Sequence, residues 1–85
     1  MRQRRGILPF NADLDRFCLD EGEEMTSLHC GDVLGIRIDA DYTWCRLEYE
    51  HRQKRWNIIF QSPPGGRESH FILYRDYWYD ACVNW

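Results

Sequence analysis

The chain has 85 residues, enough for one small domain that buries roughly 60% of its unfolded surface. Its formal net charge of −3 argues against a protein whose whole surface attracts nucleic acid. No apolar run approaches the ~18 residues of a membrane helix, and no apolar segment follows the basic N-terminus as it would in a signal peptide, so we expect a cytoplasmic protein without membrane contact.

The first third of the chain predicts an opening pair of strands. Residues 5–10 are expected to form an edge strand, because Pro9 cannot donate to a central ladder. Residues 16–20 alternate in polarity and place Phe17 and Leu19 on one face, so the two segments predict a hairpin. An acidic loop with a glycine breaker follows them.

The middle of the chain, Leu28 to Trp56, predicts two strands joined by the acidic turn 39–41, and a third strand follows at 56–60. Alternation assigns their inward-facing side chains as Leu34, Ile36, Ile38, Cys45, Leu47, Tyr49, Trp56, Ile58 and Phe60. The C-terminal third begins with a Pro/Gly loop at 61–67. Residues 70–74 then predict a strand, and 77–82 predict a further strand or irregular structure, with a short helical turn as the alternative.

These elements predict an all-β fold. Five or six short strands at regular spacing favour an antiparallel meander closed into a small SH3-like or similar barrel. Closure would also remove exposed strand edges, which an aromatic-rich chain needs. We therefore expect a single domain over 1–85, with a barrel core at 5–60 and an aromatic C-terminal segment at 68–85.

One motif order resembles a known family. Leu-His-Cys-Gly-Asp at 28–32, followed by Trp44 and by Arg-Leu-Glu-Tyr at 46–49, resembles small Firmicutes proteins of unknown function that are encoded on phages and conjugative elements. The resemblance covers about residues 5–60 and implies a compact β-barrel in a mobile-element setting, with no activity assigned. Because the C-terminal part is longer and more aromatic than in that pattern, a function specific to this protein is expected there.

The sequence predicts neither a metal site nor a catalytic site. Its four cysteines contain no Cys-x-x-Cys pair, so we expect free thiols and no zinc. His29 and Cys30 are neighbours on opposite faces and cannot act as base and nucleophile; a permissive backbone at Gly31 and a turn braced by Asp32 are expected instead.

Two carboxylates on one strand face, Glu48 and Glu50, lie about 7 Å apart. They are expected to pair with Arg46 and with the basic residues that follow, rather than to work as a catalytic pair. No other catalytic constellation supports them. We therefore expect no enzyme activity, no cofactor and no small-molecule ligand.

Two surfaces remain as candidates for binding. The first is basic and aromatic and would suit single-stranded nucleic acid; it consists of Arg52, Lys54, Arg55, Trp56 and Trp44. The second is the aromatic tail, which would suit a protein partner or a second copy; it consists of Tyr77, Trp78, Tyr79 and Trp85.

The tail aromatics occupy both parities of any strand, so they cannot all face one core. The alternative is that the tail folds over the open end of the barrel. The favoured function is a binding module of a mobile element that contacts a protein partner, for example as an inhibitor of a host defence system. The second hypothesis is a nucleic-acid-binding accessory protein.

Overall fold

The computed structural model describes residues 3–60 and 66–85. Within these residues the chain forms nine strands and no helix, which confirms the all-β class. The strands are β1 (Arg4–Leu8), β2 (Phe10–Asn11), β3 (Arg16–Asp20), β4 (Met25–Ser27), β5 (Val33–Ile38), β6 (Asp41–Glu50), β7 (Arg55–Phe60), β8 (Ser69–Ile72) and β9 (Tyr79–Val83).

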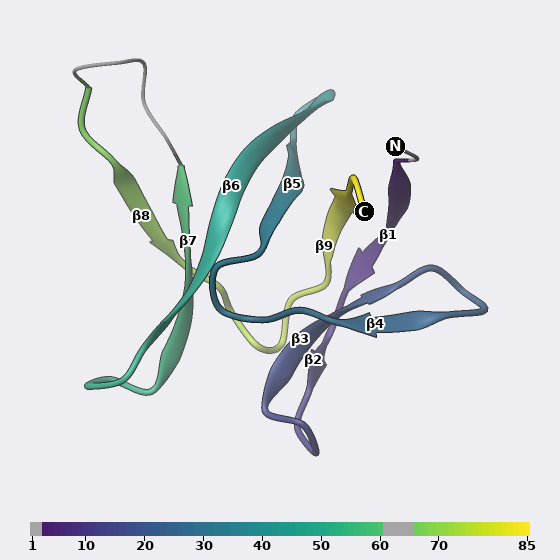
Figure 1. The fold of residues 1–85 in the computed structure, drawn as a ribbon, viewed down its shortest axis with the longest axis horizontal. Helices are drawn as coiled ribbons and strands as arrows, with labels where there is room; N and C mark the ends of the chain where they lie inside the picture. Colours follow the sequence, from purple (N-terminus) through teal and green to yellow (C-terminus); the bar gives the residue numbers. More distant parts are fainter. Residues whose placement is uncertain (1–2, 61–65) are drawn as a thin grey trace.

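All strands join one antiparallel sheet in the order β2-β3-β1-β9-β5-β6-β7-β8, with β4 pairing to β3. In Figure 1, β5–β8 lie on one side of the molecule and β1–β4 on the other, with β9 between them. The order is not that of a meander, because the last strand is inserted between the first and the fifth. The expected meander of five or six strands was therefore wrong.

The sheet is also not closed into a barrel, which corrects the predicted closure. Both edges of β9 are occupied, one by β1 and the other by β5. Closure would require β8 to pair with a strand at the other end of the sheet, β2 or β4. Of the described strands, only β7 pairs with β8. Most of the expected Pro/Gly loop, 61–67, lies outside the described residues.

β1 is a central strand and not the predicted edge strand. It pairs with β9 from Arg4↔Val83 to Leu8↔Tyr79 and meets β3 on its other side. Pro9 follows the end of β1, so its missing N–H interrupts none of these bonds. Its carbonyl instead accepts a hydrogen bond from the Cys18 N–H at 3.0 Å. Phe10–Asn11 and β3 form the predicted hairpin.

The turn before β5 has the predicted geometry. Gly31 has a φ of 94°, a conformation that favours glycine. Asp32 Oδ2 accepts the His29 N–H at 2.7 Å, and the His29 carbonyl accepts the Asp32 N–H at 3.0 Å. Asp32 therefore braces this turn, and its role is structural.

The alternation of β5, β6 and β7 builds the inner face of the sheet, defined here as the face that carries the core. The predicted inward side chains Cys45, Leu47 and Ile58 are buried. Ile38 is the exception: it was predicted inward and is 49% exposed. It lies at the end of β5, beyond the part of the inner face that other strands cover.

The covered half of the inner face is closed by the N-terminal strands. Leu8, Phe17 and Leu28 are fully buried and belong to one hydrophobic cluster with Leu47 and Trp56. The tail contributes to the same cluster through the strand β9, whose three last residues are buried. The segment 68–85 therefore contributes Leu73, Ala81 and Val83 to the core, which is not confined to 5–60.

Candidate functional site

The inner face continues beyond the core into a groove of about 620 Å³. The residues that line it come from β5, β6, β7, β8, the segment that leads into β9 and the start of β9. They are Ile36, Arg37, Ile38, Thr43, Ile58, Phe60, Phe71, Ile72, Leu73, Tyr74, Tyr77, Trp78, Tyr79 and Asp80. We call this region the open half of the inner face.

The segment 73–79 forms one wall of the groove, because it crosses from β8 to β9. Leu73 starts it beside β7, where its N–H donates to the Trp56 carbonyl at 2.9 Å. Tyr74 then donates its N–H to Tyr79 Oη at 2.9 Å, and the rings of Tyr77 and Tyr79 lie 4.7 Å apart. These contacts hold the segment in a defined turn.

Arg75 fastens the same segment to the rest of the molecule. Its Nη2 donates to the Lys54 carbonyl at 2.9 Å, and its guanidinium lies 4.7 Å from the centre of the Phe10 ring. An ion pair of 3.9 Å joins it to Asp15. Arg75 therefore anchors the aromatic wall to the β2–β3 turn and to the β6–β7 turn.

Apolar side chains in the open half are exposed to an unusual degree. Trp78 is 67% exposed and Phe71 is 54% exposed. Six of the eleven exposed large hydrophobic residues of the described chain line this groove: Ile38, Phe71, Ile72, Tyr74, Tyr77 and Trp78. A contiguous exposed apolar patch of this kind marks an interaction surface more often than an accident of folding.

The groove is nearly neutral. Arg37 and Asp80 are its only charged lining residues among those described, and they are next to each other when the β5–β9 register is extended by one position. Burial raises the pKa of Tyr79, so its hydroxyl stays neutral at physiological pH. The surface therefore suits uncharged apolar or aromatic groups, and its described lining contains no nucleophile paired with a base.

The structure brings together three of the four predicted tail residues. Tyr77, Trp78 and Tyr79 line the groove. Trp85 lies at the other end of β9, where its Nε1 approaches the Val33 carbonyl at 3.4 Å. It is exposed but does not belong to the groove, so it offers a natural control for Trp78.

The predicted basic surface is dispersed. Arg52 and Lys54 are exposed in the β6–β7 turn, and Arg55 is half-buried at the start of β7. Trp56 is only 5% exposed and belongs to the core, so its ring cannot stack on a base as predicted. Trp44 is exposed on the opposite face of β6, about 20 Å from the turn by strand length.

The β6–β7 turn is also less positive than its sequence indicates. Glu50 accepts the backbone N–H groups of Arg52 and Gln53 at 3.0 and 2.6 Å, so its carboxylate sits within the cluster. This turn therefore keeps two exposed cations, Arg52 and Lys54, without an exposed Trp, Tyr or Phe among its residues.

Cys30 is an exposed thiol without the surroundings of a nucleophile. Its Sγ donates to Glu48 Oε2 at 3.0 Å, and Arg46 Nε donates to Glu48 Oε1 at 2.7 Å, which confirms the predicted pairing of Glu48 with Arg46. The hydrogen bond to Glu48 raises the pKa of the Cys30 thiol. Because the thiolate is the reactive form, this contact lowers the reactivity of Cys30.

The other three thiols lie inside the protein. Burial, and next the nearby Cys82 thiol, raises the pKa of Cys45 to about 12. Cys18 and Cys82 are fully buried as well. Across residues 3–60 and 66–85, no three His, Cys, Asp or Glu side chains gather where they could hold a metal ion.

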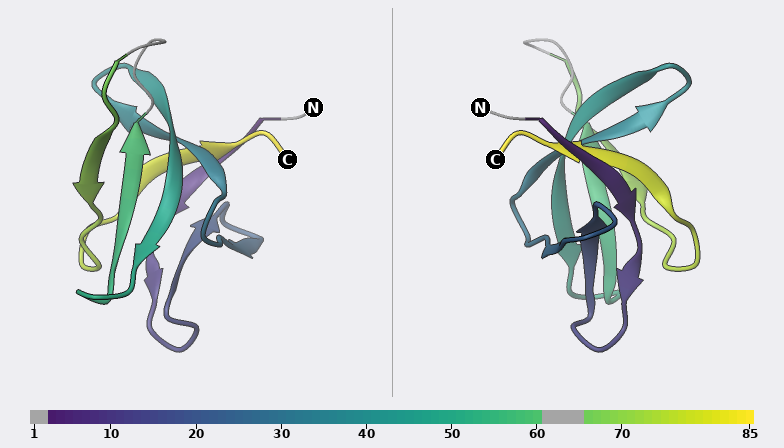
Figure 2. Two further views of the ribbon diagram at one scale, coloured as in Figure 1. Left: turned by 60° about the vertical axis from the view of Figure 1, so that its left-hand side comes forward. Right: turned by 90° about the vertical axis from the view of Figure 1, so that its right-hand side faces the viewer.

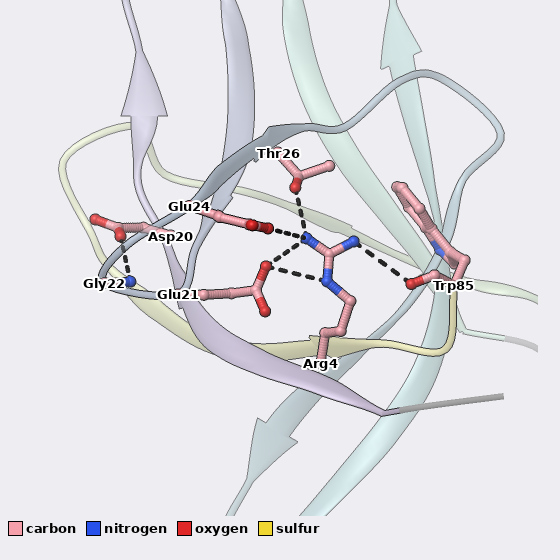
Figure 3. Close-up of polar contacts among 7 residues, drawn as sticks. All are labelled: Arg4, Asp20, Glu21, Gly22, Glu24, Thr26 and Trp85. Atoms are coloured by element: carbon pink, nitrogen blue, oxygen red, sulfur yellow. Dashed lines mark hydrogen bonds and ion pairs between the residues drawn. The ribbon is translucent and has the colours of Figure 1, made fainter.

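Arg4 and the acidic side chains of the β3–β4 loop pair with each other (Figure 3). Arg4 forms an ion pair with Glu21, donates to Thr26 Oγ1 at 2.7 Å and lies 3.9 Å from Glu24. Its Nη1 also reaches the Trp85 carbonyl at 3.4 Å. These residues fasten β1 to the β3–β4 loop, so their charges serve the fold rather than a separate binding surface.

A family model described as a domain of unknown function, DUF5348, matches residues 6–70. The chain belongs to the DUF5348 family. The resemblance to a family of unknown function is thereby confirmed over a somewhat longer span than 5–60. No curated protein and no solved structure matches the chain. Within the described residues, no helix is long and apolar enough to cross a membrane.

The DUF5348 match ends before the aromatic wall of the groove. The floor, which includes Ile36 and Ile58, lies inside the matched region, whereas Tyr74, Tyr77 and Trp78 lie outside it. β9 also lies outside the match, although it is central to the sheet. The groove thus joins a floor from the DUF5348 region to a wall from the segment after it.

Sequence reasoning missed the floor and the edge of this groove. Ile38 was assigned to the core because it continues the alternation of Leu34 and Ile36. Phe71 and Ile72 are consecutive, so one of them must lie on each face of β8. Because Phe71 and Ile72 are both apolar and point to opposite faces of a short strand, the sequence already indicated that one of these faces would remain uncovered.

Proposed function

We propose that this chain is a non-enzymatic binding module that holds a protein partner in the groove on its inner face. The observation that carries the proposal is the exposed aromatic wall of Tyr74, Tyr77 and Trp78 beside an apolar sheet face. Aromatic side chains on a fixed support are the commonest anchors of protein interfaces.

The extent of the patch supports a macromolecular partner. From their exposed fractions, Phe71, Tyr74, Tyr77 and Trp78 together expose on the order of 500 Å² of aromatic side chain. That is near the upper limit for the largest apolar patch on a typical monomer, about 600 Å². It also approaches the roughly 800 Å² that each partner contributes to a standard interface.

A mobile-element setting and a role as an inhibitor of a host defence system belong to this proposal as its specific form. They rest on the resemblance of the motifs at 28–32 and 46–49 to phage and conjugative-element proteins. A cytoplasmic location is part of the same proposal, because an inhibitor of a host defence system would encounter that system in the cytoplasm.

The test compares two exposed tryptophans, Trp78 at 67% and Trp85 at 47%. Trp78→Ala removes a groove anchor, and Trp85→Ala removes an exposed ring outside the groove. Purified wild-type and variant proteins are immobilised and exposed to lysate of the encoding organism, and sedimentation velocity measures self-association. Captured partners are identified by quantitative mass spectrometry.

Trp78→Ala is expected to weaken association by about 30-fold or more, the effect of losing an anchor worth over about 2 kcal/mol, whereas Trp85→Ala retains it. Equal loss in both variants, or unchanged association in Trp78→Ala and Tyr77→Ala, would remove the groove from the binding surface. Absence of any association, with partner or self, would overturn the proposal itself.

A further inference from the structure

We infer that the partner binds as an extended segment, which adds a strand to the free edge of β8 and places alternate side chains in the groove. The inference rests on the proposed function and specifies the form of its partner. It follows from the backbone of β8, the course of the groove and the charge of its lining.

The outer edge of β8 is open. In the described sheet β8 pairs with β7 and with nothing beyond it, and it forms the outermost strand in the left-hand view of Figure 2. Residues of an antiparallel strand point their N–H and C=O groups alternately to either side. Leu73 donates to Trp56 of β7, so Phe71 faces β7 as well, and His70 and Ile72 point their backbone groups away from it.

The open edge has a defined end. Tyr74 is the next residue with the outward orientation, and its N–H is already bonded to Tyr79 Oη at 2.9 Å. His70 and Ile72 therefore present two N–H and two C=O groups, in the spacing of a β-ladder, that no described strand satisfies. Such a row is a template for the backbone of another segment.

The groove reaches this edge. Its lining includes both Phe71 and Ile72, consecutive residues that point to opposite faces of β8. A strand added beside β8 would lie about 4.8 Å from it, and its alternate side chains would project to the inner face. Those side chains would meet Phe71 on one side and the wall of Tyr77 and Trp78 on the other.

The lining also defines the chemistry of these side chains. Its two charges, Arg37 and Asp80, are of opposite sign and adjacent in register, so no net charge faces the partner. Apolar or aromatic side chains at every second position are therefore the best fit. A loop or helix would not satisfy the backbone groups of His70 and Ile72.

A second copy of this chain is a poorer occupant. Two β8 edges could pair in antiparallel fashion, but β8 has only four residues. Such edge-to-edge pairing would extend the inner face and leave Trp78 as exposed as before. A separate segment can engage the edge and fill the groove together.

The deciding variant is His70→Pro. Proline removes the outward N–H and blocks approach of a further backbone, while the ladder to β7 does not use that N–H. The His70 side chain does not line the groove, so the apolar surface stays intact. His70→Ala is the matched control, since it removes the imidazole and keeps the N–H.

The probe is a set of 12-residue peptides selected from a random phage-displayed library on the wild-type protein, then synthesised and measured by fluorescence polarisation. We expect selected sequences with apolar residues at alternate positions. Binding is expected to fall by about 30-fold or more in His70→Pro and by less than about threefold in His70→Ala, because backbone pairing carries much of the affinity in strand addition.

A second measurement does not depend on the folding of the proline variant. Methylating one backbone nitrogen of the selected peptide blocks a single hydrogen bond. We expect strong loss only when the methylated nitrogens are those of alternate residues, the ones that face β8. Equal tolerance at both parities would overturn strand addition.

The outcomes separate the two proposals. Loss of peptide binding in Trp78→Ala with none in His70→Pro would keep the groove as the binding surface and overturn strand addition. Peptides with apolar residues spaced three and four apart, or none selected at all, would overturn the extended partner. A dimer that dissociates in His70→Pro would assign the edge to a second copy and overturn the separate segment. If neither variant affects binding, the groove itself fails as the site.

Discussion

The covered and the open halves of the inner face share the strands β5, β6 and β7 and carry similar apolar residues. Leu47 and Trp56 in the covered half are buried under the N-terminal strands. Ile38 and Phe71 in the open half point to the same face and remain about half exposed. The difference lies in what packs against them and not in their own sequence pattern. An apolar stripe on a strand therefore indicates a face that can be covered, by this chain or by another.

The largest expected effect is in the covered half. Trp56→Ala removes a buried indole from the central cluster, and we expect it to cost about 3–5 kcal/mol of the free energy of unfolding. Urea denaturation followed by circular dichroism measures this. A loss below about 1 kcal/mol would mean that Trp56 is not a core residue, and the contrast between the two halves would collapse.

A second variant changes β1, one of the N-terminal strands that cover the core, rather than a residue of the covered half. A methyl group at Gly6 would run into the backbone carbonyl of Asp20 in the neighbouring strand β3. We expect Gly6→Ala to cost about 2 kcal/mol or more, because β1 and β3 must separate. Thermal melting checks the loss, and increased binding of a hydrophobic dye would show that the covered half has opened. An unchanged melting temperature would contradict the close packing.

The buried thiol of Cys45 makes the core sensitive to alkaline pH. Its pKa is about 12 in the folded protein against 9.0 for an ordinary thiol, mainly because of burial. Below pH 9.0 both states keep the proton, so this group has no effect on relative stability there. As the pH rises from 9.0 towards 12, only the unfolded thiol ionises, and stability falls.

We therefore expect wild-type protein to lose more stability than Cys45→Ala between pH 8 and pH 11, whatever their difference at pH 8. Urea midpoints at the two pH values measure this for each protein. Parallel losses would show that Cys45 is not held neutral by the fold.

Thiol labelling tests the same difference between buried and exposed side chains, with a smaller expected effect. Cys30 is exposed, whereas Cys18, Cys45 and Cys82 are buried. We expect one thiol to react with a chromogenic disulfide reagent in the native state and the rest only after unfolding. Glu48→Gln should speed the native reaction, because the hydrogen bond to Glu48 raises the pKa of Cys30. Rapid labelling of more than one thiol would contradict the burial of Cys18, Cys45 and Cys82.

The smallest expected effect belongs to the open half. Trp78 is 67% exposed, so Trp78→Ala should change the free energy of unfolding by no more than about 0.5 kcal/mol. The same urea titration used for Trp56→Ala provides the comparison. A loss of 2 kcal/mol or more would place Trp78 in the core and remove it from the groove as a binding anchor.

Local patterns predicted the middle strands and half of the site. The alternation of Leu34 and Ile36, and of Cys45 and Leu47, placed these residues on the inner face, because a strand's period of two depends only on adjacent residues. The parity of Tyr77, Trp78 and Tyr79 likewise indicated that the tail could not be wholly buried, and Trp78 is exposed.

Pairing between distant segments could not be predicted in the same way. Nothing local in residues 79–83 marks them as the strand that separates β1 from β5. Pro9 was misleading because it stands just outside β1, and one position decides whether a proline matters to a ladder. Trp56 and Trp78 are the same residue type, but Trp56 lies in β7 and is packed into the core, whereas Trp78 lies before β9 and is exposed.

The pairing of Arg4 with Val83 has a consequence for how the chain folds. The two inner edges of the sheet, on β1 and β5, are joined only by β9, which is synthesised after both of them. Until then the nascent chain carries two unpaired edges, each able to pair with a neighbouring molecule. Contacts of such long sequence separation place folding at roughly milliseconds to seconds, as in other proteins rich in non-local strand pairs. Truncation before β9 should therefore yield aggregates rather than a smaller folded domain.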